Sequence, residues 1–329
     1  MSIDTQASTQ AETGKRRLDS LTPNTKLILY AYAATAAVLL AGALLHPGFA
    51  GWASLRAMLI VASFIGFVAA GQMLVVLIGG IDLSIPWVLN SAAIVFTTAG
   101  LGQSGRLPYA IALALCVGAA VGLLNGLGVA WLGVPAVVMT LGLNGIMQGL
   151  SLGLSGGLTC SSCASYAPEP LRRLVQGDTQ LLLWAAVAVF VTVLLSLTRF
   201  GRHVYAVGNS PRAAYLAGVP VRSVTVTLYT LSGVFAALAG ITLVAYGGQA
   251  SLGLGDPYLF ESIAAVVVGG VSILGGRGHY IGVVAGSVTL VAIVTLLQAK
   301  QVPEYGRDII YGLVILAILF TYGRDREHD

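Results

Sequence analysis

Apolar residues fall into ten long runs, separated by short segments rich in polar residues and glycine. The runs cover residues 26–45, 55–78, 85–101, 108–132, 135–154, 180–198, 223–244, 258–274, 279–298 and 307–322. A helix needs about 20 apolar residues to cross the hydrocarbon core of a bilayer. The pattern therefore predicts an all-α, polytopic membrane protein with about ten transmembrane helices.

The composition supports a membrane environment. Hydrophobic residues make up 57% of the 329 residues and charged residues only 9%, whereas soluble domains carry roughly 25% charged residues. So few charged side chains cannot cover a soluble surface, and we expect lipid to be the solvent of this chain. The net charge of +4 comes with no basic stripe of interleaved aromatic residues, so no nucleic-acid partner is expected.

The basic residues predict the orientation. Residues 1–25 are polar and contain Lys15, Arg16 and Arg17, so we expect a disordered cytoplasmic tail before an uncleaved first span. With this tail inside, eleven Lys and Arg residues lie in the cytoplasm and six outside, as the positive-inside rule prefers. An even number of spans then places both termini in the cytoplasm, with one transmembrane domain from 26 to 322 and a short tail from 323 to 329.

The cytoplasmic connection 199–222 carries four arginines and a short predicted helix. Asn209 or Ser210 caps the start of this helix, Pro211 suits its first turn and Gly218 ends it. A helix of two turns is marginal by itself in water, so we expect it to dock. Docking onto a cytoplasmic protein is the favoured interpretation, and binding of its arginines to anionic lipid is the alternative.

The segment 76–86, VLIGGIDLSIP, interrupts an apolar stretch with two glycines and an aspartate. Gly79 and Gly80 allow the chain to leave one helix, and Asp82 or Ser84 then accepts free N–H groups at the start of the next. A carboxylate within a span is costly and is a functional candidate by default. Direct contact between Asp82 and a solute is the alternative to the capping role.

Other polar side chains within spans either line a path for a polar solute or hydrogen-bond between helices. They are Asn90, Ser91, Asn125, Thr140, Asn144 and Gln148. Asn144 and Gln148 are four residues apart and share one helix face. Glu261 is the second clear intramembrane carboxylate, with either a structural partner in the bundle or a role in the pathway.

Residues for covalent or metal chemistry are scattered. The four histidines and three cysteines form no ligand cluster, so we expect no metal, no cofactor and no catalytic residue. The chain contains no G-x-x-x-x-G-K-[ST] phosphate-binding loop, so ATP hydrolysis would need a partner. Cys160 and Cys163 fall on the oxidising side of the membrane, where they can form a disulfide; two incidental cysteines are the alternative.

Two segments about five spans apart share a pattern. VLIGGIDLS (76–84) and VVVGGVSILGG (266–276) both place a glycine pair after an apolar triplet. Paired glycine-interrupted segments in corresponding halves point to transport sites. In a chain with 42 glycines, coincidence is the alternative.

Four segments carry a family resemblance. GQMLVVLIGGIDLS (71–84) resembles GQT.VI..GGIDLSVG, and GVPAVVMTLGLNGIMQGLSL (133–152) resembles P.FI.TLG...I.RGL. GRHVYAVGNSPRAAYLAGVPV (201–221) is similar to G...YA.GGN..AA..SGI.V, and DPYLFESIAAVVVGGVSILGGRG (256–278) is similar to YELDAIAAVVIGGTSL.GG.G. These blocks, in this order, resemble the permease subunits of bacterial ABC importers for monosaccharides, within the branched-chain amino acid and sugar permease family. The resemblance covers roughly residues 50–322.

The resemblance implies a translocation subunit, not an enzyme, that carries a monosaccharide or similar small polyol across the inner membrane. It implies three partners: a second permease chain, identical or different, a cytoplasmic ATP-binding subunit and a periplasmic sugar-binding protein. It also implies that the helix from Ser210 to Ala217 is the coupling helix, which sits in a groove of the ATPase. The residues carried over by position are Gly208, Asn209, Ser210, Pro211, Arg212, Ala213, Ala214, Leu216 and Gly218.

The chain departs from the family pattern after GGIDLS. The family usually has Val-Gly-Ser there, whereas this chain has Ile85, Pro86 and Trp87. A proline and a large aromatic residue in place of a small pair predict that neighbouring segments approach less closely at this point.

A function of another class is the alternative. An ion-coupled secondary transporter of a small polar solute would use Asp82 or Glu261 as its proton or cation site. Uptake driven by an ion gradient without an ATPase would favour that reading.

Overall fold

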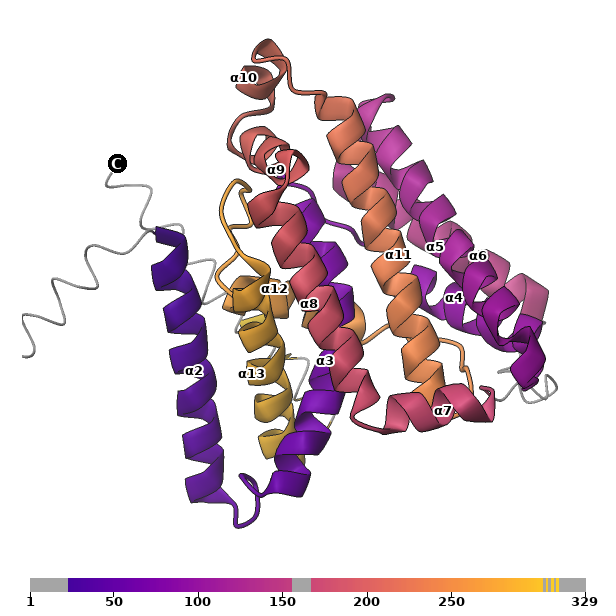
Figure 1. The fold of residues 1–329 in the computed structure, drawn as a ribbon, viewed down its shortest axis with the longest axis vertical. Helices are drawn as coiled ribbons and strands as arrows, with labels where there is room; N and C mark the ends of the chain where they lie inside the picture. Colours follow the sequence, from indigo (N-terminus) through magenta and orange to yellow (C-terminus); the bar gives the residue numbers. More distant parts are fainter. Residues whose placement is uncertain (1–22, 156–166, 304–305, 307–308, 311, 314–329) are drawn as a thin grey trace, which may run out of the picture.

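The computed structural model describes residues 23–155, 167–303, 306, 309–310 and 312–313, and contains no strand among them (Figure 1). Seven helices are long and apolar enough to cross a membrane, and two shorter apolar helices lie among them. The prediction of an all-α, polytopic membrane protein is confirmed.

The elements occur in the order α2 Pro23–Leu45, α3 Trp52–Val76, α4 Ile85–Gly100, η1 Ser104–Arg106, α5 Leu107–Ala130, α6 Ala136–Ser155, α7 Glu169–Gln176, α8 Thr179–Leu197, α9 Arg199–Asn209, α10 Pro211–Leu216, α11 Val221–Gly247, α12 Tyr258–Val268 and α13 Tyr280–Ala299. Nine of these helices fall on nine of the ten predicted spans. Most of the tenth, 307–322, lies outside the described residues, as do residues 1–22, the predicted tail 323–329 and both Cys160 and Cys163.

One predicted span ends earlier than expected. The span predicted for 258–274 ends as a helix at Val268, because a left-handed glycine, Gly270, follows it. The connection 199–222 contains a further helix, α9, before the short helix expected from Ser210. Thr198 caps α9 by accepting a hydrogen bond from the backbone N–H of Gly201 at 3.1 Å.

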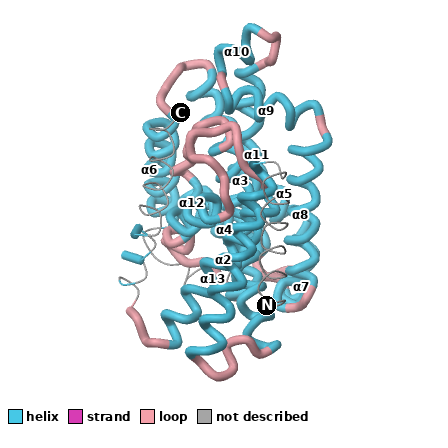
Figure 2. Tube along the Cα trace, turned by 90° about the vertical axis from the view of Figure 1, so that its left-hand side faces the viewer, coloured by secondary structure: helices cyan, strands magenta, loops and turns pink. Residues whose placement is uncertain are grey.

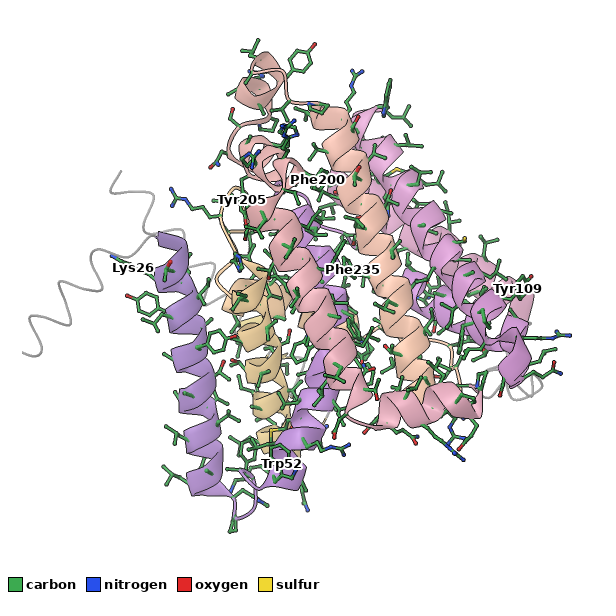
Figure 3. The ribbon with its side chains drawn as sticks, viewed as in Figure 1. Lys26, Trp52, Tyr109, Phe200, Tyr205 and Phe235 are labelled. Carbon is green, nitrogen blue, oxygen red and sulfur yellow. The ribbon has the colours of Figure 1, made fainter. Side chains whose placement is uncertain are left out.

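The helix ends gather at two poles of the bundle. We call the end that carries α9, α10 and the connection 269–279 the α10 pole, and the opposite end, which α7 crosses, the α7 pole (Figures 1 and 2). Lys26 lies near the α10 pole and Trp52 near the α7 pole (Figure 3). Basic and aromatic side chains favour the two membrane–water interfaces, so the bundle axis is consistent with the membrane normal.

Helices α3 and α11 form the centre of the bundle. In its most apolar stretch α3 is 89% buried and α11 is 72% buried, whereas α2 and α6 are 17% buried. Helix α11 packs against α3, α4 and α5. A helix that is apolar on all sides suits either a protein core or lipid, and packing decides which environment each helix has.

Glycines bring α5 and α11 into backbone contact. Gly118, Gly122 and Gly126 recur every four residues on α5, so they lie on one face. A Cβ atom on Gly118 or Gly122 would clash with the carbonyl oxygen of Gly233 or Tyr229 of α11, respectively. Small residues at this spacing allow close helix packing within a bilayer.

Both glycine pairs noted in the sequence end a helix in the same way. Gly79 after α3 and Gly270 after α12 have φ angles of 77° and 80°, which favour glycine. In both turns the amide that follows this glycine donates to the carbonyl five residues back, at 3.1 Å. This is the hydrogen-bond pattern of a Schellman cap, so the two similar sequences form the same local structure.

Candidate translocation and coupling sites

Asp82 lies in the extended segment between α3 and α4 and is 1% exposed. Its carboxylate accepts hydrogen bonds from the backbone N–H and the hydroxyl of Ser84 at 3.0 and 2.6 Å. It also accepts one from the hydroxyl of Ser232 on α11 at 2.7 Å. The Ser84 hydroxyl in turn accepts a bond from the side-chain amide of Asn125 on α5 at 2.8 Å. Asp82 therefore joins the interrupted segment to two neighbouring helices.

The Asp82 network lies deep in the bundle. Ser232 is near the middle of the 27-residue helix α11, which spans about 40 Å at 1.5 Å per residue. The carboxylate thus sits roughly midway between the two poles. Three protein donors already satisfy it, and by accepting the N–H of Ser84 it orders the residue that directly precedes α4. The predicted capping of α4 by Asp82 or Ser84 is wrong: Ser84 is the N-cap residue, but its side chain makes no capping hydrogen bond, and Asp82 bonds Ser84 instead of the free N–H groups of the first turn. The geometry supports a role for Asp82 in ordering the break before α4.

The two glycines before Asp82 have different structural roles. Gly79 supplies the left-handed turn, and a Cβ atom on Gly80 would lie 2.6 Å from the hydroxyl of Tyr229. The Tyr229 hydroxyl is buried and has no hydrogen-bond partner among the described residues, and the same holds for the side-chain amide of Gln72. The sequence analysis missed Tyr229 and Ser232, although their spacing of three residues places them on one face of α11.

The start of α4 meets the connection between α11 and α12. The side-chain oxygen of Asn90 accepts a hydrogen bond from the backbone N–H of Leu254 at 3.2 Å. A Cβ atom on Gly255 would clash with the carbonyl oxygen of Pro86. Since α11 ends at Gly247 near the α7 pole, the chain returns from that pole to the middle of the bundle before α12 begins.

This contact corrects one expectation. Pro86 was expected to weaken close approach at the start of α4, yet its carbonyl oxygen lies where Gly255 leaves no room for a side chain. Gly255 is therefore the small residue that allows the close approach, although position 86 itself carries a proline. Trp87 is 5% exposed, and its backbone N–H donates to the side-chain oxygen of Asn144 at 3.4 Å.

Helix α6 is packed on one side only. Asn144 and the Ser151 hydroxyl, which is 2.9 Å from the hydroxyl of Ser91, face α4. Gln148, four residues after Asn144 and therefore beside it on the helix, is exposed, and Leu141 is 56% exposed. The side of α6 away from α4 contains four glycines with open space around them: Gly142, Gly145, Gly149 and Gly153.

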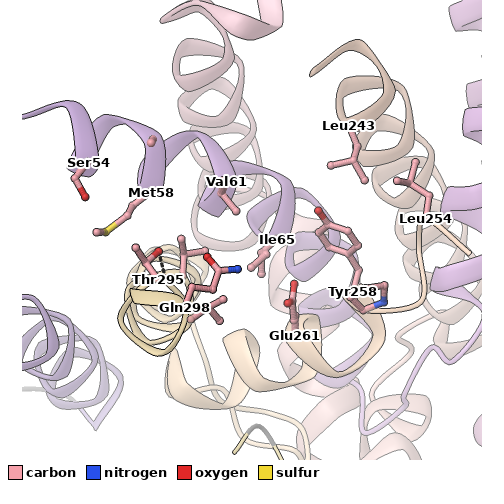
Figure 4. A pocket seen from close by; sticks show the side chains of 14 residues that line it. Ser54, Met58, Val61, Ile65, Leu243, Leu254, Tyr258, Glu261, Thr295 and Gln298 are labelled. Carbon is pink, nitrogen blue, oxygen red and sulfur yellow. Dashed lines mark hydrogen bonds between the residues drawn. The ribbon is translucent and has the colours of Figure 1, made fainter. Parts of the chain in front are cut away.

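A cavity of about 550 Å³ lies between α3, α11, α12 and α13 (Figure 4). Its lining includes Ser54 near the start of α3 and Leu243 near the end of α11, so it occupies the half of the bundle nearer the α7 pole. Leu254 and Pro257 of the returning connection line it as well. The cavity is therefore bounded toward the middle of the bundle by the segment that contacts α4.

The cavity combines an apolar wall with a few polar groups. Glu261, in the first turn of α12, points into it beside Tyr258 (Figure 4). The other polar lining residues are Ser54, Thr295 and Gln298. A carboxylate near a helix N-terminus is favoured by the helix dipole. Mostly apolar pockets of 300–1,000 Å³ with a few placed polar groups are typical of small-molecule sites.

Helix α10 projects from its pole (Figure 2). The Ser210 hydroxyl caps it by accepting a hydrogen bond from the backbone N–H of Ala213 at 3.3 Å, and Pro211 is its first residue. Ala214 is buried, whereas Tyr215 and Leu216 are 72% and 85% exposed. Leu216 is among the coupling residues predicted from the sequence, whereas Tyr215, the exposed aromatic residue beside it, is not.

Metal-binding residues do not gather within the part of the chain that the structure describes. No group of three or more histidine, cysteine, aspartate or glutamate side chains is placed to hold an ion there. Cys116 is exposed and is not in a disulfide.

Comparison with known proteins identifies the family. A family model described as the permease component of a branched-chain amino acid transport system matches residues 54–319, which is most of the chain. The chain belongs to this permease family. The match includes both interrupted segments, the cavity and α10, and the family predicted from the sequence motifs is confirmed.

Curated relatives are similar over a similar length. The autoinducer 2 import system permease protein LsrC of Escherichia coli (strain K12 / DH10B) is 34% identical over 266 residues, which cover 80% of this chain and 78% of the relative. LsrC of Yersinia pseudotuberculosis serotype O:1b is 34% identical over 273 residues, covering 80% and 76%. LsrC of Photorhabdus luminescens is 33% identical over 270 residues, covering 80% of each. No solved structure is significantly similar to this chain.

Proposed function

We propose that this chain is the translocation subunit of an ATP-driven importer for a monosaccharide or a polyol of similar size. Membership of the permease family supports transport, and the relatives are permeases of an import system. The observation that carries the ATP-driven mechanism is the tip of α10. Tyr215 and Leu216 present apolar surface to water on a six-residue helix, and such a helix needs a protein surface against which to pack.

The proposed ATPase contact implies an orientation in the membrane. A cytoplasmic ATP-binding subunit would contact α10, with Tyr215 and Leu216 in a groove and Arg212, which is exposed, beside them. The α10 pole then faces the cytoplasm, and the N-terminal end of α2 lies on the same side (Figure 3). The α7 pole faces the periplasm, where a sugar-binding protein would dock. The chain would lie in the bacterial inner membrane.

The cavity is the proposed entry point for the solute. It lies on the periplasmic side of the segment that returns to α4, and Glu261, Tyr258 and Gln298 offer hydrogen-bonding groups to hydroxyls. Its apolar wall suits the carbon face of a small sugar. Asp82 lies deeper and organises the segment that the solute passes.

The open side of α6 is the proposed contact with a second permease chain, identical or different. Exposed glutamine on a lipid-facing helix is costly, so Gln148 is better placed beside protein or water than beside lipid. The glycines on the side of α6 away from α4 allow another helix to approach closely. Asn144 and Gln148 would then line part of the pathway between the two chains.

The ion-coupled alternative has no observation in its favour. Asp82 accepts three hydrogen bonds from the protein, so its carboxylate has partners without an ion. Glu261 lies in a cavity wide enough for a small solute, which fits the importer equally well. We therefore propose the importer alone.

Reconstitution tests this function. The tagged chain is purified from its host with its partners and placed in proteoliposomes with a panel of radiolabelled pentoses, hexoses and polyols. Uptake that requires ATP and the binding protein is expected, and Leu216→Glu should abolish both uptake and copurifying ATPase activity. Leu174→Glu, on the exposed side of α7 at the opposite pole, is the matched control for copurifying ATPase activity, which it should retain. Uptake driven by a proton gradient without an ATPase would contradict the proposal.

A further inference from the structure

The two interrupted segments touch each other at the α10 pole. The backbone N–H of Gly276, in the connection after α12, donates to the carbonyl oxygen of Leu77, at the end of α3, at 2.9 Å. A Cβ atom on the neighbouring Gly275 would lie 3.0 Å from the same oxygen. The turn at the end of α3 and the connection that follows the α12 turn therefore meet backbone against backbone, with no side chain between them.

The helix that leads into α10 lies on this contact. Gly208 is the penultimate residue of α9. A Cβ atom there would clash with the Leu77 carbonyl oxygen and lie 2.6 Å from the backbone nitrogen of Gly276. A Cβ atom on Gly276 would in turn lie 2.6 Å from the side-chain oxygen of Asn209. Three chain segments that are distant in sequence thus meet at glycine backbones.

A second bond fastens α9 to the same connection. The hydroxyl of Tyr205 donates to the carbonyl oxygen of Gly278 at 2.8 Å, and Tyr205 lies beside this connection at the α10 pole (Figure 3). Two turns of α9 therefore hold the segment 275–278. Residue 209 ends α9 and Ser210 caps α10, so no flexible linker separates this contact from α10.

The same contact leads to the middle of the bundle along two routes. From Leu77 the chain runs five residues to Asp82. From Gly276 it runs back through Gly270 into α12, whose first turn follows the connection that contacts Pro86. A displacement of α9 would therefore reach both sides of the start of α4.

We propose that Gly208, Gly276 and the Leu77 carbonyl form a clasp that transmits movement of α10 to both interrupted segments. Packed backbone deforms little, so the clasp passes on a displacement that a layer of mobile side chains would absorb. These are positioning residues, because none contacts the proposed solute cavity. The inference rests on the proposed function, since it requires a partner that moves α10.

A fluorescence experiment tests the clasp without knowledge of the solute. Bimane is attached to Phe260→Cys, an exposed position on α12, in a cysteine-free chain within the complete transporter complex. Adding ATP should shift the bimane emission. Gly208→Ala should lose this shift, because its added methyl group would clash with the Leu77 carbonyl oxygen. Copurifying ATPase activity is measured in parallel for every variant. Gly247→Ala, where a Cβ atom meets open space, should retain both the shift and the ATPase activity.

The outcomes separate the clasp from the proposed function. An ATP-dependent shift that Gly208→Ala preserves, or the absence of any shift in the unaltered clasp despite active ATPase, would overturn the clasp. If Gly208→Ala does not assemble into the transporter complex, Tyr205→Phe is the deciding variant, because it adds no bulk. A reduced bimane shift in Tyr205→Phe supports the clasp, and a full shift overturns it. Absence of any associated ATPase with the unaltered chain would overturn the proposed function instead.

Discussion

The carboxylate of Asp82 accepts a hydrogen bond from the hydroxyl of Ser232 at 2.7 Å, across 150 residues of sequence. The bond ties the interrupted segment to the central helix α11. Bonds to a buried charged group contribute about 1.5–3 kcal/mol, so Ser232→Ala should lower the free energy of unfolding by about that amount. Asp82→Ala should cost more, because it also removes the carboxylate oxygen that accepts both hydrogen bonds from Ser84.

A double-mutant cycle checks this pair. Thermal unfolding of Asp82→Ala, Ser232→Ala and the double variant in detergent should give a coupling of about 1–2 kcal/mol. Additive losses would mean that the two side chains act independently. Thr227→Ala, an exposed hydroxyl on the same helix that bonds only within α11, is the control and should have little effect.

The cavity predicts which variants lose uptake without losing the fold. Glu261→Gln retains the size and hydrogen-bonding capacity of the side chain but removes its charge, and Tyr258→Phe removes one hydroxyl. Both should raise the half-saturating solute concentration by about tenfold, the effect of roughly 1.4 kcal/mol. Uptake over a range of solute concentrations and thermal stability are measured together.

One result would contradict the cavity as the solute site. If both variants transport with unchanged concentration dependence, the solute does not contact this cavity. Thr227→Ala, on α11 and absent from the cavity lining, is the reference for nonspecific effects.

The α5 glycines that contact α11 predict that a larger side chain does not fit between the two helices. Gly122→Ala should destabilise the protein by about 1–3 kcal/mol, the usual cost of overpacking, because its Cβ atom would clash with the Tyr229 carbonyl oxygen. Gly247→Ala adds the same methyl group to open space and should be neutral or slightly stabilising. Equal melting temperatures for the two variants would show that the helices separate without cost.

The α10 tip predicts two apolar contacts with the ATPase. Tyr215→Ser and Leu216→Ser each remove exposed apolar surface without an expected effect on the isolated chain. Each should weaken association with the ATPase, because exposed apolar residues at an interface centre carry much of the binding energy. Copurification of the ATPase at decreasing protein concentration measures the loss. Retention of the ATPase by the double variant would exclude the tip as the docking surface.

His279 predicts a dependence of stability on pH. Its Nδ1 accepts a hydrogen bond from the backbone N–H of Ile281 at 3.2 Å and caps α13. Burial lowers the pKa of His279 below its ordinary value of 6.5, so the folded protein binds this proton less readily than the unfolded chain. The contribution of the neutral His279 cap to the free energy of unfolding is therefore present above pH 6.5 and lost as the pH falls through the lowered pKa.

A non-titrating cap isolates this contribution. His279→Asn retains a capping oxygen, so its melting temperature should fall less than that of the unaltered protein between pH 7.5 and 5. The difference between the two proteins should grow toward acid. A difference independent of pH would show that His279 does not titrate in this range.

Much of this architecture follows from the sequence alone. Long apolar runs predict helices because a bilayer offers no partners for free backbone groups, and nine of the ten predicted spans have a helix in the described residues. The Ser-Pro start and glycine end of α10 depend on neighbouring residues only. Gly79 and Gly80 predict an interruption for the same local reason.

The tertiary structure decided what lies beside each of these elements. Hydropathy does not distinguish the buried α3 from the exposed α6, since protein and lipid are equally apolar. Pairs such as Asp82 with Ser232, Pro86 with Gly255 and Gly208 with Leu77 join residues from distant parts of the chain, and no local pattern encodes them. Close approach depends on which backbone a glycine meets, so the cavity and the clasp emerged only when the helices were packed together.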